Sequence, residues 1–244
     1  GGETGNDVYV SSVDSSGIEQ WSTKLKGSYG HEFLSGVTTD NDNNIYISGD
    51  IHSSSDFYQQ SSIGGHQDSF VSKIDSNGSV EWVKRFGSIA WDSTRSIAYG
   101  TDGNLYVTGI YGHGVDSIGF ITKIDQNGSL VWTQYVGDSV QDVSIKDENS
   151  IYVTGYTSSN IDGESLAGET DVFISEYDNE GNRKWTKFLG SSQNDHSYGL
   201  DLDRENNIVI AGGTFGSLGG ETNLGSQDAF LSLLLIDSGD ASYS

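Results

Sequence analysis

The chain has 244 residues, and hydrophobic residues make up 34% of it, a low share for a protein with one conventional core. Its 35 acidic against 12 basic side chains give a formal net charge of -23, which argues against nucleic acid and anionic membrane surfaces as partners. The absence of cysteine excludes a disulfide framework and thiolate metal sites, and no apolar run is long enough for membrane insertion.

The first predicted elements are two strands joined by a tight turn. Alternating side chains over residues 9–13 indicate a strand. Asp14 and Gly17 in the following turn predict a hairpin with a second strand. A third strand at 36–38 and a fourth at 45–49 follow after a polar turn. Because the chain has 33 glycines and no proline, we expect turns made by residues that tolerate positive φ.

The same four-strand succession recurs along the chain with a period of about 50 residues, which is typical of solenoids, propellers and arrays. Each copy carries an aspartate, a glycine three residues later and a tryptophan seven residues after the aspartate. The aspartate and tryptophan pairs are Asp14 and Trp21, Asp75 and Trp82, Asp125 and Trp132, and Asp178 and Trp185. The copies cover 7–67, 68–117, 118–170 and 171–227, and an extra strand at 228–237 has lost both the turn aspartate and the tryptophan.

Four short antiparallel strands in each unit predict an all-β fold, a β-propeller with one four-stranded blade for each repeat. Residues 1–244 are therefore expected to form a single propeller domain or a fragment of a larger ring, with further blades in the same parent chain. The missing initiator methionine predicts an excised or processed piece. The connections from each fourth strand to the next first strand vary most in length, and such insertions often mark the binding face of a repeat protein.

The second unit carries a resemblance to a known family. Its segments read Asp68-Ser69-Phe70-Val71-Ser72-Lys73-Ile74-Asp75, followed by Trp82, and Gly103-Asn104-Leu105-Tyr106-Val107-Thr108-Gly109. This pattern resembles the bacterial β-propeller repeats of the SBBP type, and the resemblance extends over nearly the whole chain. It implies a propeller within a large surface or secreted bacterial protein, and it supplies no catalytic residues. The third unit departs from the pattern, because Ile118 replaces the aspartate that opens the other units.

The four repeated tryptophans allow two interpretations. They could form a stacking platform for sugars or bases, or they could pack between blades. Their fixed place in the strand favours packing.

Two acidic turns resemble the start of a calcium loop, because a hard cation prefers several carboxylate and amide oxygens within one turn. One turn contains Asp40, Asp42 and Asn44, and the other contains Asp201, Asp203 and Glu205. The alternative is that both are plain β-turns, since Lys146 occupies the place equivalent to Asp40 in the third unit. Calcium at a site shared by these two divergent turns is therefore the one cofactor that the sequence leaves open.

Aromatic side chains outside the repeat register are the candidates for ligand binding. Trp91 is the one tryptophan off the register, and Asp92 and Arg95 lie beside it. An exposed aromatic ring next to a charge pair is typical of a carbohydrate or protein contact. Phe57 and Tyr58 lie in the longest connection. The alternative for these residues is packing beneath their own loops.

No catalytic constellation is evident, because the five histidines lack metal-ligand spacing and no nucleophile elbow occurs. The sequence therefore favours a non-enzymatic interaction, adhesion or scaffold module of an extracellular or cell-surface bacterial protein, which binds a protein or polysaccharide surface through its variable loops. One alternative is a polysaccharide-active enzyme with carboxylates near the propeller axis. Another is a calcium-dependent carbohydrate-binding module.

Overall fold

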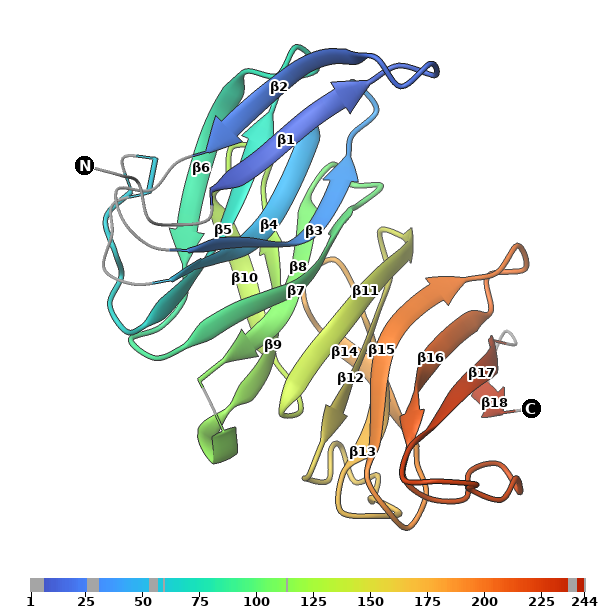
Figure 1. The fold of residues 1–244 in the computed structure, drawn as a ribbon. Coiled ribbons are helices and arrows are strands. Elements are labelled where there is room, and N and C mark those ends of the chain that lie inside the picture. Colours follow the sequence, from blue (N-terminus) through green and yellow to red (C-terminus); the bar gives the residue numbers. More distant parts are fainter. Residues whose placement is uncertain are drawn as a thin grey trace.

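A computed structural model describes residues 7–25, 31–52, 57–58, 60–112, 114–236 and 241–243, and its long elements are all β-strands (Figure 1). The strands form a series of antiparallel four-stranded sheets, preceded by one two-stranded sheet. A single turn of 3-10 helix, η1 (Gly114–Asp116), lies in one connection. Among the residues described, no helix is long and apolar enough to cross a lipid bilayer.

Each sheet is built from strands that are consecutive in the chain. The two-stranded sheet pairs β1 (Val8–Val13) with β2 (Glu19–Leu25). The next sheet contains β3 (Glu32–Thr39), β4 (Ile45–His52), β5 (Gln67–Ile74) and β6 (Val80–Phe86). It is followed by β7 (Asp92–Tyr99), β8 (Leu105–Tyr111), β9 (Ile118–Ile124) and β10 (Leu130–Tyr135).

The last two sheets repeat this arrangement. One contains β11 (Ser139–Asp147), β12 (Ser150–Thr157), β13 (Asp171–Tyr177) and β14 (Arg183–Leu189). The other contains β15 (Asp195–Leu202), β16 (Ile208–Thr214), β17 (Asp228–Ile236) and the short β18 (Ala241–Tyr243). The predicted extra strand at 228–237 is β17, and β18 extends the array beyond it.

The sheets are offset by two strands from the repeat units that the sequence defines. We expected the four strands of one unit to share one sheet. Instead, a sheet takes the third and fourth strands of one unit and the first and second strands of the next. The long connection between β4 and β5 therefore stays within a sheet, whereas the connection from β2 to β3 passes between sheets. The sequence repeat has the same period whether a sheet begins at the first or at the third strand of a unit. The repeat alone therefore could not decide which four consecutive strands share a sheet.

The aspartate and glycine of the repeated turn close each hairpin in the same way. In the turn between β5 and β6, Asp75 Oδ1 accepts the backbone N–H groups of Asn77 (3.0 Å) and Ser79 (2.7 Å). Gly78 has a φ of 89° and donates its N–H to the Asp75 carbonyl. This turn requires a short side-chain acceptor at its first position and a residue that adopts positive φ at its fourth, which explains the fixed pattern.

The apolar core lies between successive sheets. The described residues form four clusters of buried side chains, and each joins residues of one sheet to residues of the next. One cluster, for example, combines Tyr46 and Val71 with Ile97, Val107 and Phe120 of the following sheet. Both faces of an inner sheet are therefore covered, and a chain of low overall hydrophobicity can bury its apolar side chains without a single thick core.

The first strands of the four-stranded sheets lie next to one another. β3 contacts β7, β7 contacts β11, and β11 contacts β15. In Figure 1 the sheets follow one another from the blue β1–β2 pair to the red β17–β18 pair, which lie at opposite ends of the array. Residues near the starts of the first strands are thus brought together from different sheets.

The repeated tryptophans connect neighbouring sheets. Trp21, Trp82 and Trp132 each donate the indole N–H to a backbone carbonyl in the turn of the following sheet, over 3.0–3.1 Å. The acceptors are Ser76, Gln126 and Asn179. Trp185 instead donates to the Glu176 carboxylate of its own sheet. The rings of the first three tryptophans are therefore part of the packing between sheets.

Candidate functional site

The variable connections gather at one end of the array, which we call the loop end. Because the strands are antiparallel, the β4–β5, β8–β9, β12–β13 and β16–β17 connections lie at this end. The segments that lead from one sheet to the next, including 87–91, lie there as well. The aspartate–glycine turns lie at the opposite end. The candidate binding residues Phe57, Tyr58, Trp91, Asp92 and Arg95 are therefore all at or near the loop end.

A cavity of about 460 Å³ opens at the loop end, and we call it the Trp91 cavity. Trp91, Ser93 and Arg95 line it from the start of β7 and the preceding segment. Gln67 of the preceding sheet and Tyr156 of the following sheet also line it, together with Asp138 before β11. The rest of the lining is Asp92, Ile110, Gly112, Gly114 and Ser117. Side chains from three sheets therefore contribute to one concave site, as is common for ligand-binding pockets.

Two histidines flank the Trp91 ring. The ring centroid of His52 lies 5.5 Å from that of Trp91 in an edge-on arrangement, and that of His66 lies 5.7 Å away. Residues Gln67 and Trp91 also form an isolated backbone bridge. The Trp91 side chain remains 38% exposed. A partly exposed indole can offer apolar surface to a ligand ring.

A chain of polar contacts connects Arg95 to β4 of the preceding sheet. Its guanidinium donates to Ser93 Oγ over 3.0 Å, and Ser93 Oγ donates to Asp50 Oδ2 over 2.7 Å. Asp50 Oδ1 also accepts the Thr94 backbone N–H over 2.8 Å. Burial raises the pKa of Asp50, although these hydrogen bonds and Arg95 act in the opposite direction. Asp50 thus joins β4 to β7 and orients the residues that line the cavity.

Asp92 belongs to the lining of the Trp91 cavity, but its side chain has a structural role. Its side chain is fully buried, and its two oxygens accept the backbone N–H and the hydroxyl of Ser88. Burial raises the pKa of Asp92. Asp195 makes the same two contacts with Ser191 in the last sheet. The position therefore closes the segment that leads into a first strand, and its carboxylate faces that segment.

Phe57 is also a core residue and not a binding residue. Its side chain is fully buried, and its ring lies 5.0 Å from that of Phe70 between centroids. The connection folds back over the sheet, so Phe57 covers Phe70 as the alternative interpretation expected. Tyr58 is exposed, has a φ of 46°, and is not part of the Trp91 cavity.

The two acidic turns use their carboxylates as caps. Asp40 accepts hydrogen bonds from the backbone N–H groups of Asp42 and Asn44 and from the Asn44 side chain, and these bonds outweigh burial and lower its pKa. Asp203 accepts equivalent bonds from Glu205 and Asn207, and its pKa is also lowered.

The two turns belong to different sheets, the first and the last of the four-stranded ones. Asp201 lies on β15 and accepts the backbone N–H of Leu202. Within the described part of the chain, no three His, Asp or Glu side chains are grouped so as to hold a metal ion.

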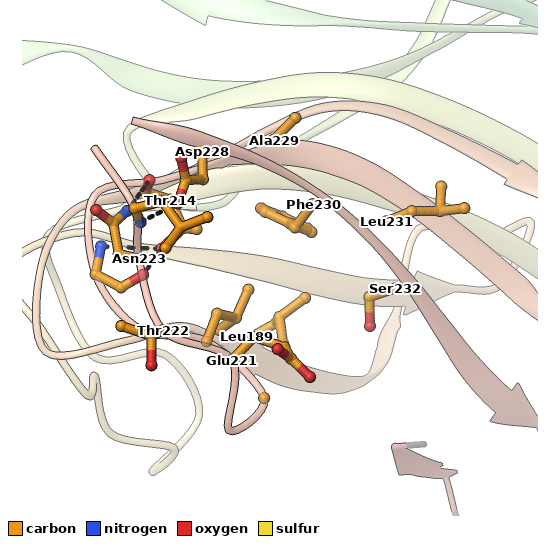
Figure 2. Close-up of a pocket in the computed structure, with 14 residues that line it drawn as sticks. Leu189, Thr214, Glu221, Thr222, Asn223, Asp228, Ala229, Phe230, Leu231 and Ser232 are labelled. Carbon is orange, nitrogen blue, oxygen red and sulfur yellow. Dashed lines mark hydrogen bonds between the residues drawn. The ribbon is translucent and has the colours of Figure 1, made fainter. Parts of the chain in front are cut away.

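A larger hollow of about 810 Å³ lies beside β17 (Figure 2). Hydrogen bonds gather Thr214, Asn223 and Asp228 at one end of it, and Phe230, Leu231 and Ser232 follow along β17. β18 pairs only with Leu234–Ile236, whereas β6 pairs along the equivalent strand from Ser69 to Ile74. The hollow thus follows a strand edge where the other sheets have a longer fourth strand, and we do not assign it to a ligand.

Several residues of the Trp91 cavity escaped the sequence analysis. Gln67, Asp138 and Tyr156 line it, and His52 and His66 lie against Trp91, although these residues come from several distant segments of the chain. The two histidines were considered only as metal ligands, for which their spacing is unsuitable. One indication of a role for them was present in the sequence, namely that the other repeats have no histidine at these positions, just as they have no tryptophan at the position of Trp91.

Comparisons with known proteins are limited to structures. No family model and no curated protein matches the chain. A protein of unknown function from Bacteroides caccae is similar over 99% of this chain and 69% of its own, with a TM-score of 0.53 and 12% identity. This likeness concerns the fold alone.

Two further structures have lower TM-scores. Hydrazine synthase from Kuenenia stuttgartiensis has a TM-score of 0.48 and 14% identity, over 93% of this chain and 70% of that chain. A xylan β-1,4-xylosidase from Bacillus halodurans C-125 has a TM-score of 0.44 and 12% identity, over 87% and 42%.

Proposed function

We propose that this chain is a non-enzymatic β-propeller module of a secreted or cell-surface bacterial protein, and that it binds a neutral polysaccharide in the Trp91 cavity. The succession of four-stranded sheets with neighbouring first strands supports the propeller. The resemblance to SBBP-type repeats supports the bacterial surface setting.

The observation that carries the binding proposal is the convergence at the loop end. Trp91, Arg95, Gln67 and Tyr156 come from three sheets and line one cavity. Trp91 lies outside the repeat register, whereas Trp21, Trp82 and Trp132 donate to turns of the next sheet. A site that varies between repeats while the scaffold stays constant is typical of binding on repeat proteins.

The chemistry of the lining favours an uncharged sugar. An indole face packs against the apolar face of a pyranose ring, and the amide of Gln67, the guanidinium of Arg95 and the carboxylate of Asp138 can bond its hydroxyl groups. Asp50 and Asp92 lie close by, and the chain carries a net charge of -23, so an anionic polysaccharide would be repelled.

The test is retardation of the protein in native gels that contain cellulose, mannan or chitin, with a gel lacking polysaccharide as the reference. We expect one of these polymers to retard the natural chain, and Trp91→Ala to weaken that binding at least about tenfold, because loss of a central aromatic contact costs about 1.4 kcal/mol or more. Tyr58→Ala is the matched control, since it removes an exposed aromatic ring outside the cavity and should leave binding unchanged.

Three results would contradict the proposal. Equal retardation of Trp91→Ala and the natural chain would remove Trp91 from the site. Release of reducing sugar from the retained polymer would favour the polysaccharide-active enzyme. Loss of binding in a chelator would favour the calcium-dependent module, because the proposed binding in the Trp91 cavity requires no metal.

A further inference from the structure

The two-stranded β1–β2 sheet corresponds to the third and fourth strands of the four-stranded sheets. β1 matches β5, β9 and β13 in register: Tyr9 pairs with Lys24 as Phe70 pairs with Arg85, and both strands carry a bulge before their last residue. β5, β9 and β13 also pair on their other edge with β4, β8 and β12. The corresponding edge of β1 pairs with no strand among the residues described.

Side chains on β1 show what is missing from this sheet. Tyr9 is 56% exposed and Val13 is 60% exposed. Their equivalents in the other sheets are 0–3% exposed, namely Phe70, Phe120 and Phe173 for Tyr9 and Ile74, Ile124 and Tyr177 for Val13. The same positions are thus buried in three other sheets of this chain. In those sheets the strand is paired on both edges, and the preceding sheet packs against its face.

The strand β3 of the next sheet also has side chains that lack the cover found in the later sheets. Leu34 is 44% exposed and Val37 is 66% exposed. Their equivalents are 0–6% exposed, namely Thr94, Val140 and Ser197 for Leu34 and Ile97, Val143 and Leu200 for Val37. Those residues are covered by the first and second strands of the preceding sheet, which are the two strands that the β1–β2 sheet lacks.

In the complete sheets, the strand that pairs with the equivalent of β1 has a glycine at a fixed position. Gly49, Gly109 and Gly155 pair with Phe70, Phe120 and Phe173. A Cβ added at any of them would lie 2.0–2.1 Å from a backbone carbonyl oxygen of the first strand and 2.7–2.8 Å from the ring. Tyr9 takes the place of these phenylalanines, so a first and second strand beside β1 need glycine opposite Tyr9.

From this template we infer that the open edge of β1 takes up two antiparallel strands of the same repeat, a first and a second sheet strand like β7 and β8, with glycine opposite Tyr9. These strands complete the sheet and cover Leu34 and Val37. A second copy of this chain does not offer them, because its own pairs of this type already form complete sheets. The inference concerns an edge of the array and goes beyond the proposed binding of polysaccharide.

The test adds such a pair to the whole chain. A copy of residues 88–117 is placed directly before Asp7. This copy contains β7, β8 and the connection that normally joins β8 to β9, and here the connection joins the copied β8 to β1. We expect amide hydrogen exchange in β1 to slow at least about tenfold relative to the natural chain. Protection of β13, in the middle of the array, reports that the rest of the protein remains folded.

The matched control carries Gly109→Val in the added copy alone. The inference expects it to lose the protection of β1, because the valine side chain would collide with the backbone carbonyl of the copied Ser93 and with Tyr9. If the added copy leaves β1 exchange unchanged while β13 stays protected, or if the valine control protects β1 equally, the inference is wrong.

Two further measurements cover the remaining cases. If the longer chain loses protection of β13, the peptide 88–112 is added to the natural chain at about millimolar concentration, and absence of β1 protection then counts against the inference. Sedimentation of the natural chain is measured in parallel. A dimer in which β1 is already protected would show that a second copy occupies the edge, and would overturn the assignment.

Discussion

A pair of glycine substitutions would measure the contact between a repeated tryptophan and the next turn. Gly17 and Gly181 occupy the same place in the repeated turn, with φ values of 79° and 86°. A Cβ added at Gly181 would lie 2.9 Å from Trp132 Cδ2, whereas a Cβ at Gly17 would meet no atom within 4 Å. The two substitutions to alanine therefore share the backbone strain and differ in the collision with the ring.

The expected magnitudes follow from these two terms. Alanine at a positive φ costs roughly 1–2 kcal/mol. Forcing an extra methyl group into a packed contact costs about 1–3 kcal/mol more. Gly17→Ala should therefore destabilise the protein by about 1–2 kcal/mol and Gly181→Ala by about 2–5 kcal/mol. Because a chain of this size loses about 2–4 °C of melting temperature for each kcal/mol, the two variants should differ by several degrees.

The assay is urea unfolding monitored by circular dichroism, with a double-mutant cycle between Gly181→Ala and Trp132→Ala. When the ring is absent, Gly181→Ala should cost only the backbone term, which gives a coupling energy of about 1–3 kcal/mol. Gly78→Ala repeats the test at another interface, where the added Cβ would lie 2.7 Å from Trp21. Equal losses at Gly17 and Gly181, together with no coupling to Trp132, would refute the packing role of the repeated tryptophans.

Three further predictions concern the core, the charges and calcium. Phe57→Ala should lower the free energy of unfolding by about 3 kcal/mol, because its ring is fully buried, and urea unfolding that matches the natural chain would contradict this. Asp102→Asn should cost about 3 kcal/mol at pH 7, since it leaves the buried Lys123 ammonium without the carboxylate 2.8 Å away. Although burial acts against it, hydrogen bonding from Lys123 and Asn104 lowers the pKa of Asp102. The stabilisation is therefore complete above the unfolded pKa of about 4 and lost below it, so melting curves of the two proteins should converge as the pH falls. Excess calcium should leave the melting temperature within about 1 °C of its value in chelator, whereas a bound ion at a hundredfold excess over its dissociation constant would add about 2.7 kcal/mol.

The local elements of this protein could be predicted because the signals for them are local. Alternation along residues 9–13 and the spacing from Asp14 to Trp21 involve neighbours in the chain, and both correspond to observed strands and turns. Trp91 stood out because it lies off the repeat register, Arg95 and Asp92 stood out because they lie beside it, and all three line the same cavity. The hydrogen bonds of Asp92 to Ser88 could not be foreseen from its position beside Trp91.

By itself, the sequence determined the all-β class, the repeating unit and the turn chemistry, because strand periodicity and positive-φ turns depend on residues a few positions apart. Only the tertiary structure decided which strands share a sheet, that Phe57 is buried on Phe70, and that His52, His66 and Tyr156 meet near Trp91. These features depend on which distant segments pair and on what covers each face. A periodic sequence permits more than one such pairing, and packing between sheets selects one of them.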